Sequence, residues 1–128
     1  MNEIAVDYGR KRTGFAICLS GVVIPLDPLS ETSWNGISSR LKHIQDENAA
    51  GTVILGLPLT AEGKHTELSR EVEKLAEYLR NSGFIVELVR ETGSTAETVE
   101  ETGTNRRRDG RKDSLAAMII LKRYLGMP

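Results

Sequence analysis

Three acidic residues that are far apart in the sequence could form one catalytic centre. Asp7 ends a short apolar segment, Glu91 follows another, and Asp113 precedes a strongly apolar run. If the first two segments are parallel strands and the third is a helix packed on them, the three carboxylates can converge on one rim of a sheet. Carboxylate oxygens are the ligands that Mg²⁺ and Mn²⁺ prefer, and water completes the coordination. Two such ions can activate a water and stabilise the leaving oxygen of a phosphodiester.

Each acid also has a purely structural alternative. Asp7 stands before Gly9 in a polar turn, and Asp and Gly commonly serve β-hairpin turns. Asp113 could be a helix N-cap or a first-turn acid favoured by the helix dipole. Taken alone, therefore, neither residue establishes a metal site.

The sequence lacks the residue patterns that other common kinds of catalytic site require. No Cys and His cluster favours zinc, no Ser, His and Asp arrangement suggests acyl transfer, and the Walker A pattern is absent. The single cysteine, Cys18, lies inside an apolar segment and is expected to be a small buried hydrophobe. A chain with one cysteine can form no internal disulfide, which fits a reducing, cytoplasmic compartment.

The hydrophobic pattern predicts the elements that would position these acids. Three short strands joined by turns come first, and Pro25 indicates that the third lies at an edge of its sheet or contains a bulge. A strand apolar on both faces follows an amphipathic helix, and a second helix, strand and helix then alternate. Ser94–Glu97 has the spacing of a capping box for a further short helix through about residue 101. The predicted strands are 4–6, 15–19, 22–26, 51–58 and 84–89, and the main helices begin near 34, 65 and 113.

Composition limits the class of protein. The 128 residues, 39% hydrophobic and 27% charged, are expected to form one α/β domain. No segment has the run of about 20 apolar residues that spans a bilayer, and the N-terminus has no signal-peptide layout. The net charge of −1 argues against a generally basic nucleic-acid binder. Residues 105–128, however, hold seven Lys or Arg against two Asp, so a nucleic-acid contact would be a local patch.

Cations are concentrated in three segments near the predicted rim. One is the turn after Asp7, and another is the loop 59–64 at the carboxyl end of a buried strand. The third, 102–112, carries five cations and two glycines and suits a phosphate backbone, although a merely solvated loop is the alternative. The predicted substrate-binding residues are Arg10, Lys11, Lys64, Arg106, Arg107, Arg108, Arg111 and Lys112.

Four segments resemble one known family. They are IAVDYGRKRTGFA at 4–16, VILGLPLTAEGK at 53–64, the ST pair at 94–95 and KDSLAAMIIL at 112–121. Together they resemble the YqgF-type, RuvC-like nucleases of the RNase H-like superfamily. The resemblance implies a single domain with a five-stranded mixed sheet, order 3-2-1-4-5, covered by helices. It also implies divalent-metal-dependent cleavage of nucleic acid, with Asp7, Glu91 and Asp113 as the catalytic acids holding Mg²⁺ or Mn²⁺, two ions in all.

The resemblance leaves the substrate and partners open. The family is described as processing the ends of precursor 16S ribosomal RNA, which implies structured RNA and pre-ribosomal particles as partners, and earlier as resolving Holliday junctions. A resolvase that cuts two strands symmetrically needs a homodimer, whereas an RNA end-processor can work as a monomer.

One departure from the family pattern favours an alternative function of a different class. Where the family commonly has D-E-R, this chain has Arg90-Glu91-Thr92. A weakly active or non-catalytic nucleic-acid-binding factor for ribosome assembly is therefore an alternative. A phosphate-binding module of the sugar-kinase and actin type shares the D-x-G hairpin, but 128 residues leave no second domain to close over ATP.

Overall fold

The computed structural model describes residues 2–30, 32–92 and 110–128, with side chains in these ranges except those of 110–113. The short helix expected near 94–101 lies outside the described residues. The elements are β1 (Asn2–Asp7), β2 (Thr13–Leu19), β3 (Val22–Leu29), α1 (Trp34–Asn48), β4 (Ala50–Pro58), α2 (Glu67–Asn81), β5 (Val86–Glu91) and α4 (Gly110–Leu125).

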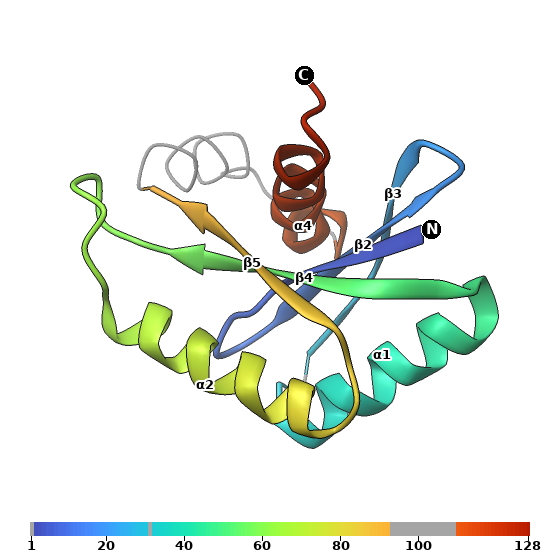
Figure 1. Cartoon of the computed structure of the whole chain (residues 1–128), viewed down its shortest axis with the longest axis horizontal. Coiled ribbons are helices and arrows are strands. Elements are labelled where there is room, and N and C mark those ends of the chain that lie inside the picture. The colour runs from blue at the N-terminus through green and yellow to red at the C-terminus, as the bar shows by residue number, and fades with distance from the viewer. Residues whose placement is uncertain (1, 31, 93–109) are drawn as a thin grey trace.

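The five strands form one mixed sheet in the order β3-β2-β1-β4-β5, which confirms the predicted order. β1 pairs antiparallel with β2 and parallel with β4, and β4 pairs parallel with β5. β3 lies at an edge, one of the two possibilities that Pro25 indicated, since a proline has no N–H for a further ladder. The carboxyl ends of β1, β4 and β5 therefore lie at the same rim (Figure 1).

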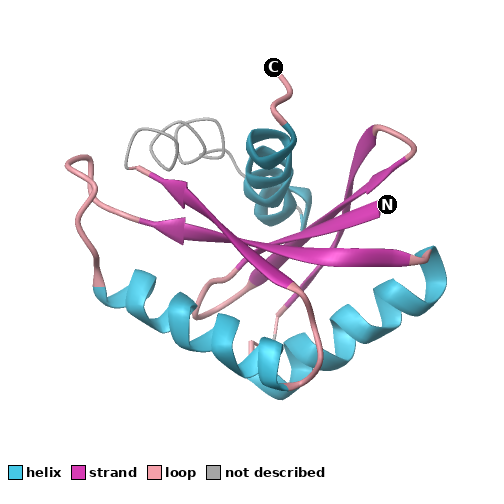
Figure 2. Cartoon of the chain, in the orientation of Figure 1, coloured by secondary structure: helices cyan, strands magenta, loops and turns pink. Residues whose placement is uncertain are grey.

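Helices cover both faces of this sheet (Figure 2). α1 and α2 lie on one face, where Val6, Phe15 and Leu55 belong to the larger hydrophobic core. α4 lies on the other face and buries Ala117, Ile120 and Leu121 against the sheet. The apolar final helix was expected to pack in this way, since an apolar helix surface is stabilised by burial.

Several predicted boundaries differ from the structure. The strand expected at 84–89 is β5 at Val86–Glu91, because Phe84 N–H donates to Leu79 O and so belongs to the turn that ends α2. β3 continues to Leu29 rather than ending at 26. α4 begins at Gly110, so 110–112 are helical and Asp113 lies inside the first turn rather than at the N-cap.

Two helix starts follow their local sequence. Ser33 caps α1 by accepting from Gly36 N–H at 3.0 Å, and Thr66 caps α2 in a capping box with Ser69. Trp34, the first residue of α1, packs against the core, and its ring centroid lies 5.5 Å from that of Tyr78. No helix in the described part of the chain is long and apolar enough to cross a membrane.

Candidate active site

Strand alternation brings Asp7 and Glu91 to the same face of the sheet. Side chains along a strand point alternately to opposite faces. Ala5 of β1 packs in the core cluster under α4, and Val89 of β5 packs against that cluster. Asp7 and Glu91 stand two residues further along these strands, at their carboxyl ends, so both lie at the rim on the α4 side.

β4 separates the two acids. Leu55 of β4 pairs with Val6, so Gly56 lies beside Asp7, whereas Glu91 pairs with Pro58, two residues further along β4. Neighbouring strands lie about 4.8 Å apart, so β1 and β5 are about 10 Å apart. The offset of two residues along the strands places the backbones of Asp7 and Glu91 about 12 Å apart. A Cβ built on Gly56 would lie 3.7 Å from the Glu91 carboxyl carbon and 2.5 Å from Ile120 Cδ1. The Glu91 carboxyl group therefore reaches over β4 toward β1, and α4 approaches the sheet closely at this point.

The Glu91 carboxyl group is poorly solvated. Its side chain is 14% exposed, and Oε2 is buried with no hydrogen-bond partner among the described residues. Arg123 is a cation beside this carboxyl group, and its Nε lies 3.9 Å from Oε2, beyond hydrogen-bond distance. Burial raises the pKa of the Glu91 carboxyl, and the Arg123 charge partly opposes that rise. A buried carboxylate oxygen without a donor is unfavourable, so this oxygen fits the ligand set of a divalent cation.

Asp113 has its backbone in the first turn of α4, and its side chain lies outside the described residues. The next residue, Ser114, is fully buried and donates its hydroxyl to Leu26 O of β3. Leu26 is in register, through β2, with Val6 of β1. The start of α4 therefore lies at the same rim as Asp7. Asp113 as a third ligand stays a prediction, and the side chains that are described form no cluster of three metal-binding residues.

The turn after Asp7 is held by a residue that sequence reasoning did not identify. Glu71 of α2 accepts from Tyr8 OH at 2.8 Å and from Arg10 Nε and Nη2 at 3.1 and 3.0 Å. The hydrogen bond from Tyr8 is the largest cause of a lowered pKa of the Glu71 carboxyl, and the contacts with Arg10 lower this pKa further. Nothing in the spacing of the acidic residues of this helix distinguishes Glu71 from its neighbours.

This contact also decides where Arg10 points. Tyr8 packs in the core under α1 and α2, and Arg10 pairs with α2, so both lie on the face opposite Asp7. Arg10 as a substrate contact stays a prediction, and it would require the guanidinium to leave Glu71.

The other predicted substrate contacts are only partly within the described chain. Lys11 and Lys64 are exposed. The loop that carries Lys64 is closed by Lys64 N–H, which donates to Thr60 Oγ1 at 3.0 Å. Arg90 Nη2 lies 3.7 Å from a Cβ built on Gly63, so the exposed Arg90 reaches this loop. Arg106, Arg107 and Arg108 lie outside the described residues, and Arg111 and Lys112 are in the first turn of α4 with undescribed side chains.

A Ser, His and Glu trio at the start of α2 is structural. His65 Nδ1 lies 2.9 Å from Ser69 Oγ, and His65 Nε2 lies 3.7 Å from Glu73 Oε2. The Ser69 hydroxyl, however, is fully buried and bonded to the backbone of Thr66. A hydroxyl engaged in a helix cap and removed from solvent cannot serve as a nucleophile for an external substrate.

Two proteins of similar sequence carry the same name. A protein from Mycoplasmopsis pulmonis, provisionally named pre-16S rRNA nuclease, is 33% identical over 135 residues, covering 98% of this chain and 92% of its own length. A Campylobacter jejuni protein with the same name is 28% identical over 128 residues, covering 99% of this chain and all of its own.

Solved structures share the fold. Thermus thermophilus RuvC superposes with a TM-score of 0.55 at 12% identity, over 99% of this chain and 98% of that one. The same protein in complex with a Holliday junction substrate gives a TM-score of 0.51 at 12% identity, over 98% and 96% of the two chains. At such identity the likeness concerns the fold, and it confirms the predicted RNase H-like class. The family model of RuvX, described as Holliday junction resolvase, matches residues 1–127, and the chain therefore belongs to the RuvX family.

Proposed function

We propose that this protein is a divalent-metal-dependent endonuclease that processes the ends of precursor 16S ribosomal RNA. Its family and fold make it a nuclease that hydrolyses phosphodiester bonds. The observation that carries metal dependence is the buried Oε2 of Glu91, at the same rim as Asp7, which has no hydrogen-bond partner among the described residues. The names of the relatives from Mycoplasmopsis pulmonis and Campylobacter jejuni favour RNA as the substrate. Cytoplasmic pre-ribosomal particles are its proposed partners.

The proposed ligands are Asp7, Glu91 and Asp113, and the proposed ions are Mg²⁺ or Mn²⁺, two in all. When bound, such ions supply activation of a water and stabilisation of the leaving oxygen. The protein contributes rigidity, because Asp7 and Glu91 are the last residues of β1 and β5, two strands of one sheet, and do not lie in loops. It also contributes a poorly solvated site, in which charge interactions are stronger than in water.

Exposed cations around this rim are proposed to hold the strand. Lys11, Lys64 and Arg90 are exposed near the carboxyl ends of the strands. Contacts from such side chains to phosphates position a nucleic acid without reading its sequence. Arg106, Arg107, Arg108, Arg111 and Lys112 are proposed to extend the same contact. Arg90 is also a candidate to replace the arginine that this chain lacks after Glu91.

Resolution of Holliday junctions is the second candidate. It is favoured by the description of the family and by the likeness to a RuvC structure solved with a junction. A symmetric double cut would require a dimer, whereas RNA end processing would not. Oligomeric state during cleavage therefore separates the two candidates.

The test compares wild type with Asp7→Asn and Glu91→Gln, each incubated with structured rRNA precursor or a four-way DNA junction. Glu87→Gln is the matched control, since Glu87 is an exposed acid of the same strand β5. We expect cleavage with Mn²⁺, none with EDTA, loss in the first two variants and retention in the control. Calorimetric titration of Mn²⁺ should show weakened binding in the same two variants.

Three results would contradict parts of this proposal. Cleavage in EDTA, or undiminished cleavage by folded Asp7→Asn, would remove the metal mechanism. Cutting of the junction but not of the RNA would establish the second candidate. Binding of RNA without any cutting would establish a non-catalytic factor and would point to the altered Arg90-Glu91-Thr92 motif.

A further inference from the structure

The last turns of α4 carry two cations that the proposed active site does not use. Residues 114–128 contain Lys122 and Arg123 and no acidic residue, in a chain whose net charge is −1. Arg123 Nε lies 3.9 Å from Glu91 Oε2, yet its side chain is 44% exposed while that of Glu91 is 14% exposed. The Arg123 side chain is therefore partly exposed beside the buried carboxylate. Lys122 forms no ion pair with any residue that the structure describes.

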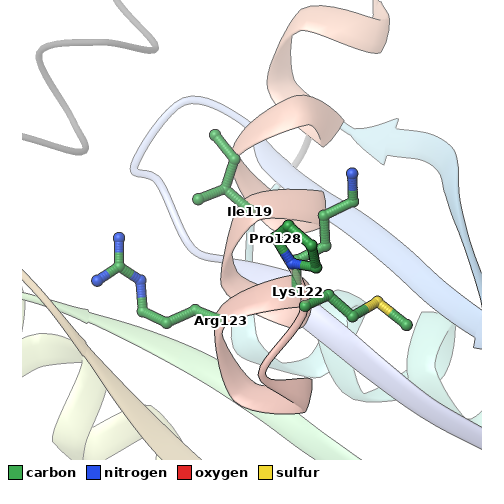
Figure 3. A pocket seen from close by; sticks show the side chains of 5 residues that line it. Ile119, Lys122, Arg123 and Pro128 are labelled. Atoms are coloured by element: carbon green, nitrogen blue, oxygen red, sulfur yellow. The ribbon is translucent and has the colours of Figure 1, made fainter.

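These two cations border a surface hollow. It has a volume of about 380 Å³ and is lined by Ile119, Lys122, Arg123, Met127 and Pro128. Figure 3 shows the two cationic side chains extending in different directions, with Pro128 between them. The hollow is at the small end of the range of ligand sites in proteins. Cations at the border and apolar side chains between them suit a unit with a charged phosphate and a less polar sugar or base.

The position of the hollow relative to β5 suggests how a strand would reach it. Arg90 and Glu91 are consecutive in β5, so their side chains point to opposite faces of the sheet. Arg90 is exposed toward the loop 60–64, and Arg123 stands beside Glu91 on the α4 side. A strand that passes over the end of β5 would therefore meet cations on both sides of the acid.

We propose that Lys122 and Arg123 form a second phosphate-binding site, which holds the nucleic-acid backbone on the α4 side of Glu91 with one nucleotide over the hollow. The inference rests on the proposed nuclease function and extends its substrate contact to a surface outside the predicted set. Arginine presents a planar fork of donors that matches two phosphate oxygens, and lysine adds a point charge. An exposed acidic peptide could use the same cations, but a site that adjoins the proposed nuclease acids favours a continuing strand.

A purely structural role for Arg123 makes a different prediction. If Arg123 only compensates the charge of Glu91, its replacement affects Glu91, and replacement of Lys122 has no effect on nucleic-acid binding. Lys122 is therefore the discriminating residue, because its ammonium group is not part of the Glu91 contact.

The experiment measures binding of fluorescent structured RNA by anisotropy, in EDTA to prevent cleavage, between 50 and 200 mM salt. The proteins are wild type, Lys122→Gln, Arg123→Gln and the control Lys42→Gln, which removes an exposed charge from α1 on the opposite face. Each phosphate contact contributes about 0.7–0.9 to the slope of log affinity against log salt. When salt rises fourfold, from 50 to 200 mM, the affinity of wild type for RNA should therefore fall by a factor about three times larger than the affinity of Lys122→Gln or Arg123→Gln. The control should keep the wild-type slope.

Two RNAs of unrelated sequence should show the same loss, since a backbone contact carries no sequence information. In the cleavage assay, Lys122→Gln should raise KM and leave kcat unchanged. If both variants keep the wild-type slope of log affinity against log salt, the proposed phosphate-binding site is wrong. Cleavage by wild type would show in that case that the proposed function still holds. An effect of Arg123→Gln without one of Lys122→Gln would overturn it in favour of the structural role. Absence of RNA binding by wild type, together with absence of cleavage, would overturn both the site and the proposed function.

Discussion

Replacing Gly56 by alanine tests how closely α4 approaches the sheet beside the candidate active site. The new Cβ would lie 2.5 Å from Ile120 Cδ1 and 2.9 Å from Ile120 Cγ1, distances at which something must shift. Overpacking of this kind costs about 1–3 kcal/mol. Loss of glycine freedom in the unfolded chain offsets about 0.4–1 kcal/mol of that. We therefore expect Gly56→Ala to lower the free energy of unfolding by about 1–2 kcal/mol.

The matched variant Ile120→Val removes Cδ1, the atom in the shortest contact. Alone it should cost about 0.5–1.5 kcal/mol, since it deletes one buried methyl group. Valine keeps Cγ1, which lies 2.9 Å from the new Cβ, so the double variant should regain only part of the cost of Gly56→Ala, a favourable coupling of about 1 kcal/mol. Urea denaturation of the four proteins measures this coupling. Thermal midpoints should follow by about 3–5 °C per kcal/mol at this chain length.

Additivity would refute this reasoning. If the effects of the two substitutions sum to within about 0.5 kcal/mol of the double variant, Ile120 does not lie against Gly56 as described. The Glu91 carboxyl carbon, 3.7 Å from the same Cβ position, is in ordinary contact and should tolerate the new methyl group. Unchanged calorimetric Mn²⁺ affinity in the folded double variant would check that point.

Three further results are expected. Tyr8→Phe removes the hydrogen bond to Glu71 and should cost about 1 kcal/mol in urea unfolding; equal stability would show that this bond contributes nothing to holding the turn. Ser114→Ala leaves Leu26 O without its side-chain donor and should cost about 1–2 kcal/mol in the same assay. Burial raises the pKa of the Glu91 carboxyl, so the unfolded chain ionises at lower pH than the folded one and stability falls as pH rises through that interval. In EDTA, Glu91→Gln should therefore have a higher free energy of unfolding than wild type at pH 7, and this difference in stability should shrink toward about pH 4. Addition of Mg²⁺ or Mn²⁺ should raise the thermal midpoint of wild type but not that of Glu91→Gln.

Local patterns of hydrophobic residues predicted most of the helices and strands. Val72, Leu75, Ala76 and Leu79 recur at helical spacing and are the buried residues of α2, with Ser69 at its cap. β4 is apolar on both faces because both are covered, and Pro25 indicated that β3 is an edge strand or contains a bulge. Such signals depend only on the period of the chain and on the chemistry of single residues. The order of the strands, in contrast, came from the family resemblance.

The acids of the candidate site were named from the sequence, but their environment was not. Asp7 and Glu91 were identified because each stands at the carboxyl end of an apolar segment. That Glu91 would be largely buried, with an oxygen lacking a hydrogen-bond partner in the described chain, depends on Gly56 and on the path of α4. Burial and pKa are properties of what surrounds a group, and those surroundings come from distant parts of the chain.

The sequence by itself therefore determined the elements, the family and the identity of the candidate acids. Only the tertiary structure decided that Glu71, and not another acid of the same helix face, would hold the turn after Asp7. It also decided that Arg123 would stand beside Glu91, 32 positions earlier in the chain. The physical reason is that hydrophobic periodicity is a local property, whereas a contact between two helices or strands depends on how the whole sheet and its covering helices are assembled.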